Sequence, residues 1–124
     1  MEGITANLSV ILGIFRAKVE IPTITVIGGG AKGAVWRQVM ADVYRAEILR
    51  PKYLEEATSM GAAVIAGVGC GLFPDFSAAS RFIEITERTI PNLANEPVYD
   101  TLRTLMDECY AALEPIFPKL GVRV

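Results

Sequence analysis

The stretch TITVIGGGAKGAVWRQV, residues 23–39, decides the expected fold of this chain. It opens with residues 23–27, which are all Thr, Ile or Val and are typical of a short β-strand covered on both faces. Three glycines follow, and from Ala34 to Tyr44 the apolar side chains recur at helical spacing. The stretch therefore predicts a strand, a tight glycine turn and an amphipathic helix.

The neighbouring segments extend this unit on both sides. Residues 2–18 carry apolar side chains at helical spacing and predict a buried helix, which Pro22 closes. Residues 47–49 predict a second short strand, which ends at Pro51. The order helix, strand, helix, strand predicts that the two strands are parallel and that the helix between them makes a right-handed crossover.

The second half of the chain is expected to be helical. Residues 54–70 form a helix with very small side chains, residues 75–83 a short helix, residues 92–97 a polar loop and residues 98–115 a long last helix. The fold class is therefore α/β and helix-rich, with a short parallel strand pair flanked by helices. Such a pair is a poor independent sheet, so we expect further strands upstream of Met1.

The composition indicates a partner surface. Hydrophobic residues make up 52% of the chain and its 11 glycines add about 9% more, which exceeds the roughly 45–50% of ordinary soluble domains. No apolar run reaches the roughly 20 residues of a membrane-spanning helix. We therefore expect no membrane partner and interpret the excess as a surface that contacts protein outside the 124 residues.

The charge of the chain argues against a nucleic-acid partner, and its cysteines indicate a reducing compartment. The net charge is −2 and the 12 basic residues are scattered, so no nucleic-acid partner is expected. Cys70 and Cys109 are expected to be reduced thiols of a cytoplasmic protein, and Met1-Glu2-Gly3 does not begin an export signal. Assembly into a homo-oligomer stays open.

The turn GGGAKG, residues 28–33, is the candidate binding site. Glycines let a ligand approach the backbone closely, and a helix N-terminus offers unpaired N–H groups and a positive dipole to an anion. A phosphate or a nucleotide suits this pattern, although a turn without a ligand suits it equally. A P-loop is excluded, because Gly33 is followed by Ala34 and Val35 rather than by Lys and Ser or Thr.

Two alternatives remain on the residues alone. The turn also matches the Gly-x-Gly-x-x-Gly dinucleotide fingerprint, which expects an acidic residue about 20 positions further on, where this chain has Leu49-Arg50-Pro51. Because Arg50 could suit a 2′-phosphate, a small NADP-binding Rossmann-type unit is one alternative. A non-catalytic interaction module that docks a partner through the small-sided helix is the other.

The ionisable residues offer no catalytic group. The chain has no histidine, which excludes histidine acid–base chemistry and the commoner transition-metal sites. The pairs Glu55-Glu56, Asp107-Glu108 and Glu84 with Glu87 are interpreted as solvated helix faces. Asp42, on the helix after the turn, could cap a neighbour or pair with Arg45 or Arg37. We assign no catalytic residue and no metal ligand.

Two motifs together resemble a known family. Residues 27–32, followed by Trp36-Arg37-Gln38 and Ala41-Asp42-Val43, are similar to the adenosine-site segment of the FGGY family of carbohydrate kinases, most of all its xylulokinase branch. Residues 56–73 resemble the helix that follows the nucleotide turn in that family. Residues 2–4 and 99–117 resemble its preceding and final helices, so the resemblance spans nearly the whole chain.

The resemblance implies a partial actin-like ATPase (ribonuclease H-like) fold. Residues 1–124 would form the C-terminal part of the second, nucleotide-binding domain, and the N-terminal sugar-binding and catalytic domain would lie outside the chain. The implied reaction transfers the γ-phosphoryl group of ATP to a sugar hydroxyl, with D-xylulose as the implied sugar and xylulose 5-phosphate as product. Mg²⁺ would be held mainly by absent parts, so this chain alone is expected to be inactive.

The resemblance also implies which residues bind the nucleotide. The turn would lie against the adenosine and the α-phosphate, and Gly33 departs from the serine often found there. We expect Gly30→Val to abolish nucleotide binding, because a Cβ branch would occupy the nucleotide's space. The implied nucleotide-binding residues are Gly28, Gly29, Gly30, Ala31, Lys32, Gly33 and Trp36.

Overall fold

The computed structural model describes residues 1–121. Its α-helices are α1 (Glu2–Arg16), α2 (Ala34–Tyr44), α3 (Ala57–Gly69), α4 (Glu96–Leu113) and α5 (Phe117–Leu120). Its strands are β1 (Thr23–Thr25), β2 (Glu47–Pro51) and β3 (Ile85–Thr89). Short 3₁₀ turns cover Gly29–Ala31, Phe76–Phe82, Leu93–Asn95 and Glu114–Ile116. The helix-rich α/β class is confirmed.

The sheet has three strands in the order β1-β2-β3. β1 and β2 are parallel, with Thr23 opposite Glu47, so the predicted parallel pair is confirmed. β3 runs antiparallel to β2, with Ile48 opposite Thr89, and makes the sheet mixed. β3 was not predicted, because its sequence Ile-Thr-Glu-Arg-Thr is mostly exposed and lacks an apolar alternation.

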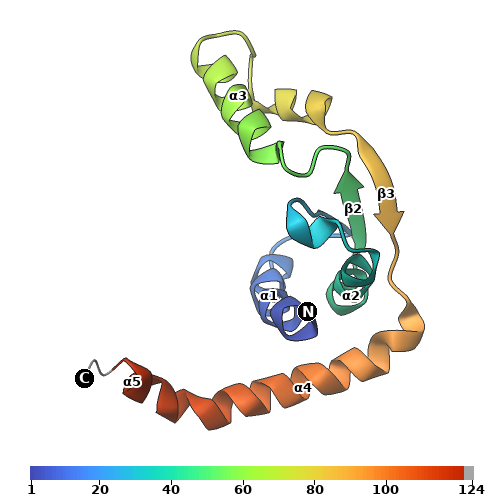
Figure 1. Ribbon diagram of the computed structural model, residues 1–124, viewed down its shortest axis with the longest axis vertical. Helices are drawn as coiled ribbons and strands as arrows, with labels where there is room; N and C mark the ends of the chain where they lie inside the picture. Colours follow the sequence, from blue (N-terminus) through green and yellow to red (C-terminus); the bar gives the residue numbers. More distant parts are fainter. Residues whose placement is uncertain (122–124) are drawn as a thin grey trace.

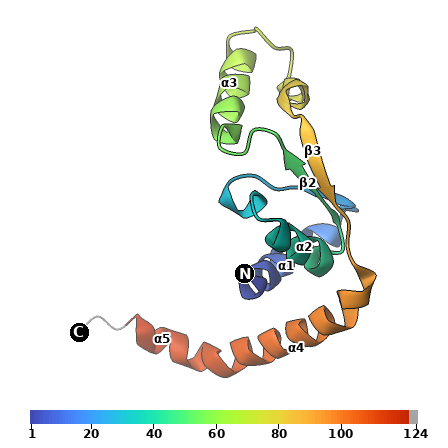
Figure 2. The ribbon, with the colours of Figure 1, turned by 45° about the vertical axis from the view of Figure 1, so that its right-hand side comes forward.

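The core lies between the sheet and α2. Met40, Ala41 and Tyr44 of α2 pack with Ala46 and with Ile48 of β2, and these five side chains are buried. Helix α1 lies beside α2, as Figures 1 and 2 show from two directions. The glycine turn is thus carried by the best-packed part of the molecule.

The expectation that residues 2–18 form a buried helix is wrong in one respect. The segment is helical, but its buried residues are the polar Thr5 and Ser9, which face the protein. The apolar positions that were expected inside are about half exposed, at 57% for Ile4, 46% for Leu8, 52% for Ile11 and 58% for Phe15. Helical spacing predicted the apolar stripe correctly, but no described element covers it.

The expectation that β1 is covered on both faces is also wrong. Thr23 and Thr25 are exposed and Ile24 is half-buried. In the described residues Ile24 packs against the core that α2 and β2 form, and β1 is one edge of the sheet. A β-branched run identifies a strand, but it does not show what lies against it.

Helices α3 and α4 extend away from the sheet at its two ends. In Figures 1 and 2, α3 lies beyond the start of β3, and α4 begins beyond the end of that strand and runs past α2 and α1, which it contacts. Residues of α4 with large apolar side chains, including Val98, Leu102, Leu105 and Leu113, are exposed. Within residues 1–121, no helix is both long and apolar enough to span a membrane.

Candidate functional site

The glycine turn is closed by its own backbone. The Ala31 N–H donates to the Gly28 carbonyl at 3.1 Å and the Lys32 N–H donates to the Gly29 carbonyl at 3.2 Å. Gly28 has φ 73°, a left-handed conformation that favours glycine over any residue with a side chain. Its N–H donates to the carbonyl of Leu54 at 3.1 Å, which ties the turn to the loop before α3.

The turn leaves several backbone donors available. In the part of the chain that the structure describes, the N–H groups of Gly29, Gly30 and Gly33 donate to no backbone acceptor. Gly33 is the N-cap of α2, and no side chain caps this helix end. Unpaired N–H groups and the positive end of the helix dipole attract anions. The arrangement therefore fits a phosphate group.

The two central glycines face different ways. A Cβ built on Gly29 meets no atom within 4 Å, so this side of the turn is open. A Cβ on Gly30 would lie 3.5 Å from both Trp36 and Met40 and would point into the protein. A side chain at Gly30 would therefore first meet Trp36 and Met40 and not the open side of the turn, and the effect of Gly30→Val on nucleotide binding stays a prediction. Gly29 is the position whose side chain would enter the open side of the turn.

Ala31 and Trp36 support the turn from the inside. Ala31 is completely buried. The Trp36 ring lies against Gly30, and its Nε1–H donates to Oγ1 of Thr5 on α1 at 3.0 Å. Trp36 thus joins the turn to the neighbouring helix.

Lys32 is the cationic side chain of the turn. Its ammonium group forms an ion pair with Glu55, in the loop before α3, and both side chains are mostly exposed. The hydrogen bond and the charge of Lys32 hold the pKa of Glu55 below its ordinary value. The ion pair therefore links the turn, through Lys32, to the loop before α3, through Glu55.

Arg37 and Glu87 form a contact beneath the turn that the sequence did not reveal. Glu87 was interpreted as part of a solvated helix face, but it lies on β3 and pairs with both Arg37 and Arg50. Glu84 is not on a helix either, because it precedes β3, and it pairs with Lys52. The interpretation failed because the strand that carries this pattern was itself not predicted.

Asp42 has a structural role on the far side of α2. Its carboxylate is buried and accepts hydrogen bonds from Gln38, from the Asn92 backbone N–H and from Asn95, at 2.7–2.8 Å. Asp42 therefore caps the loop between β3 and α4 and does not pair with Arg45 or Arg37. Arg45 pairs instead with Glu96 and Asp100 of α4.

The arrangement gives no support to the dinucleotide alternative. Arg50, which was considered for a 2′-phosphate, pairs with Glu87 at 3.0 Å and donates to Oγ1 of Thr86 at 3.1 Å. It lies within β2, opposite Glu87 in the antiparallel register. Its charge is therefore used inside the sheet.

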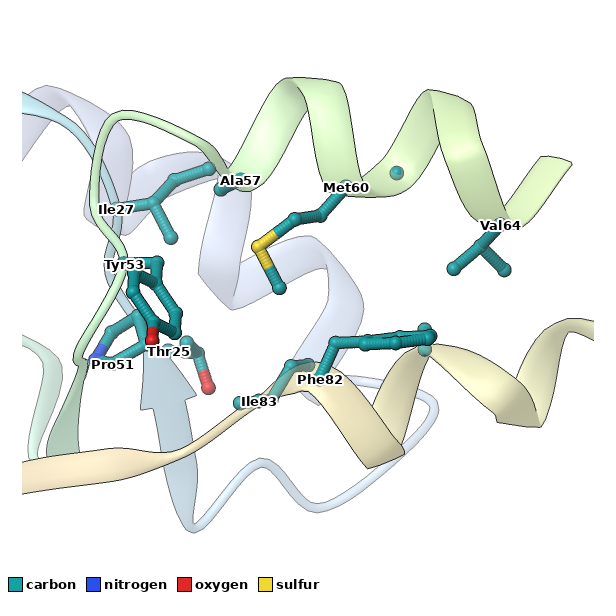
Figure 3. A pocket seen from close by; sticks show the side chains of 11 residues that line it. Thr25, Ile27, Pro51, Tyr53, Ala57, Met60, Val64, Phe82 and Ile83 are labelled. Atoms are coloured by element: carbon teal, nitrogen blue, oxygen red, sulfur yellow. The ribbon is translucent and has the colours of Figure 1, made fainter. Parts of the chain in front are cut away.

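A separate apolar cavity of about 230 Å³ lies between α3 and the end of the sheet. Figure 3 shows Tyr53, Met60 and Phe82 around it, with Ile27 and Ala57 at its rim. No lysine, arginine, aspartate or glutamate lines it, and none of residues 28–33 does so. Its chemistry suits an apolar group and not a phosphate.

No metal centre is visible in the described part of the chain. Among residues 1–121, no three His, Cys, Asp or Glu side chains lie close enough together to hold a metal ion. Cys70 and Cys109 are both free and exposed. The turn is thus the feature of the described residues that combines open donors with a nearby cation.

Comparison with known proteins gives consistent matches. Residues 1–70 match the family described as the FGGY family of carbohydrate kinases, C-terminal domain. A xylulose kinase of Staphylococcus epidermidis is 39% identical over 112 residues, which are 89% of this chain and 22% of that protein. A xylulose kinase of Bacillus subtilis is 35% identical over 112 residues. The chain thus spans about a fifth of the length of these relatives.

A solved structure shares the fold of the whole described chain. The ligand-bound xylulose kinase of Lactobacillus acidophilus superposes with a TM-score of 0.83 and 25% identity, over 97% of this chain and 24% of that one. These sugar kinases have the actin-like ATPase fold. Residues 27–43 of the first motif and residues 56–70 of the second lie inside the region that matches the family.

Proposed function

Because the chain belongs to the FGGY family of carbohydrate kinases, through their C-terminal domain, we propose that it is the nucleotide-binding part of an ATP-dependent sugar kinase. The observation that carries the proposal is the turn at residues 28–33, with three backbone N–H groups that have no backbone partner in the described chain. Donors that are free before a nucleotide arrives need no rearrangement to bind it.

The turn residues have distinct roles in this proposal. Gly29 and Gly30 lie against the adenosine and the α-phosphate through their backbone, and the buried Ala31 supports them from the inside. Gly28 and Gly33 shape the turn at its two ends. Lys32 contributes a positive charge near the phosphates. Trp36 acts from behind the turn, because its indole N–H is bonded to α1.

ATP supplies the phosphoryl group, and this chain's own residues hold and orient the nucleotide. Phosphoryl transfer depends mainly on positioning and on neutralising charge. The described residues contain no candidate metal cluster. We therefore propose that the groups that hold Mg²⁺ and activate the sugar hydroxyl belong to another domain, and that residues 1–124 alone bind nucleotide without turning over sugar.

The domain arrangement and the substrate are part of the proposal. Since the chain spans 22% of the S. epidermidis relative, residues 1–124 would correspond to the C-terminal part of the second domain of a longer kinase. Relatives named xylulose kinase favour D-xylulose as the sugar and xylulose 5-phosphate as the product. A kinase that uses cellular ATP is expected in the cytoplasm.

Calorimetric titration of the protein with Mg-ADP, Mg-ATP and NADPH tests the nucleotide site. We expect binding of the adenine nucleotides and none of NADPH. Gly29→Val should weaken Mg-ADP binding at least about tenfold, because its branched side chain enters the open side of the turn. Gly13→Ala on α1 is the control, since its Cβ also meets no atom within 4 Å but lies outside the turn.

Two results would contradict the proposal. Tighter binding of NADPH than of Mg-ATP would favour the dinucleotide alternative. Equal Mg-ADP affinity in the wild type and in Gly29→Val would remove the turn from the site.

A further inference from the structure

Arg37 is the buried arginine that reaches the glycine turn from below. It lies in the first turns of α2, and only 4% of its surface is exposed. Its Nη1 donates to the carbonyl oxygens of Ala31 at 2.6 Å and Lys32 at 3.1 Å. Its Nη2 forms an ion pair with Glu87 of β3. One guanidinium group therefore joins the last residues of the turn to the edge strand of the sheet.

Stability alone is a weak explanation for this contact. Removing the Arg37 guanidinium from water costs free energy that its attraction to the half-exposed Glu87 carboxylate does not reliably return. Arg37 also leaves its Nε–H buried without a hydrogen-bond partner in the described residues, which adds a further cost. Arg37 is thus better explained by the geometry that it holds than by the stability that it adds.

The two carbonyl groups face the guanidinium, and their peptide planes carry the next N–H groups of the turn. Because a peptide unit is planar, fixing the Ala31 and Lys32 carbonyls also fixes the N–H groups of Lys32 and Gly33. A charged donor on a carbonyl polarises that peptide and makes its N–H a stronger donor. The Gly33 N–H is one of the groups without a backbone partner.

We propose that Arg37, held by Glu87, is a positioning residue that fixes the turn in the form that binds the nucleotide phosphates. This inference rests on the proposed function of the turn. It assigns the role to a side chain that does not itself touch the ligand and acts through the backbone of Ala31 and Lys32.

Arg50 provides a matched control within the same cluster. It pairs with the other oxygen of Glu87, Oε1, at 3.0 Å, and it too has a buried Nε–H without a partner. It donates to Thr86 of β3 and makes no hydrogen bond to the turn. Loss of either arginine removes one positive charge beside Glu87, but only loss of Arg37 releases the turn carbonyls.

The test is calorimetric titration with Mg-ADP of the wild type, Arg37→Gln, Arg37→Lys and Arg50→Gln. We expect Arg37→Gln to weaken binding at least about tenfold and Arg50→Gln less than about threefold. Arg37→Lys should recover part of the loss, because an ammonium group can still donate to a carbonyl but cannot span both carbonyls and Glu87. Carbon NMR shifts of the Ala31 and Lys32 carbonyls should move in Arg37→Gln and stay in Arg50→Gln.

Glu87→Gln keeps the inference testable if Arg37→Gln does not fold. This variant leaves the guanidinium in place and loosens its anchor, so it should weaken Mg-ADP binding by about threefold to tenfold and shift the same carbonyl signals. Equal loss of affinity in Arg37→Gln and Arg50→Gln, or unmoved carbonyl signals in Arg37→Gln, would overturn the inference while the nucleotide site stands. Absence of Mg-ADP binding in the wild type would overturn the proposed function, and this inference with it.

Discussion

At the scale of single residues, the exposed pair of Lys32 and Glu55 shows how the turn balances its charge. Lys32 lies in the turn and Glu55 in the loop before α3, 23 positions later. An exposed pair contributes little to stability, because water and salt screen it. The main effect of the pair is to hold the Lys32 ammonium group beside the turn.

The pKa of Glu55 reports this pair directly. It is lowered by the hydrogen bond and the charge of Lys32, so we expect Lys32→Met to raise it toward the ordinary glutamate value. Because the folded-state pKa is the lower one, the small stabilisation is present above the unfolded pKa and disappears as the pH falls. Carboxyl NMR titration measures the shift.

Lys52→Met is the matched control for this titration. Lys52 forms a similar exposed pair, with Glu84 at 2.9 Å, and its loss should leave Glu55 unchanged. An unaltered Glu55 pKa in Lys32→Met would show that the two side chains are not paired in solution.

At the scale of elements, the small side chains of α3 have a packing role at one position. A Cβ built on Gly67 would lie 2.5 Å from the ring of Phe73, whereas a Cβ on Gly61 meets no atom within 4 Å. The N–H groups of Leu72 and Phe73 donate to the Gly67 carbonyl at 2.7 and 3.1 Å. The loop after α3 therefore folds back over Gly67, and this position requires the absence of a side chain.

Alanine at these two glycines should have opposite effects. Gly61→Ala should raise the free energy of unfolding by up to about 1 kcal/mol, through helix propensity. Gly67→Ala should lower it by about 1 kcal/mol or more, because the Phe73 ring must move away. Urea unfolding followed by circular dichroism measures both. A stabilised Gly67→Ala would show that Phe73 packs elsewhere in solution.

At the scale of the whole molecule, large apolar faces lie open on α1 and α4. The side chain of Leu8 is 46% exposed and that of Leu105 is 49% exposed, although both lie on regular apolar stripes. Contiguous apolar surfaces of this kind usually contact other protein. The chain covers 24% of the solved kinase that it resembles. We propose that the rest of a longer kinase covers these faces.

Leu8→Glu tests whether the apolar face of α1 is exposed in residues 1–124 alone and covered in the complete kinase. In residues 1–124 alone it should change the free energy of unfolding by less than about 0.5 kcal/mol, as expected at a half-exposed site. In the complete kinase it should lower that value by about 2–4 kcal/mol, because a charge would enter a core. Chemical unfolding of both proteins measures the difference, with the exposed Glu108→Gln as a neutral control. Equal effects in both proteins would contradict a covered face.

Local patterns predicted most of the elements but not their surroundings. Helices α1, α2, α3 and α4 follow from apolar periodicity, and the parallel pair follows from two short β-branched runs. β3 was missed because its three central residues, Thr86, Glu87 and Arg88, are polar and exposed and give no local apolar signal. Glu87 was misassigned for the same reason, since its role depends on the strand that carries it.

The sequence by itself determined the family, the order of the main helices and of the parallel strand pair, and the position of the glycine turn. These properties reside in short runs of neighbouring residues, where backbone propensity and glycine content act locally. Only the tertiary structure decided that Gly30 faces the core and Gly29 the open side, and that Arg37 meets Glu87 across 50 positions. Such contacts depend on strand register and helix orientation, which arise when distant segments pack together.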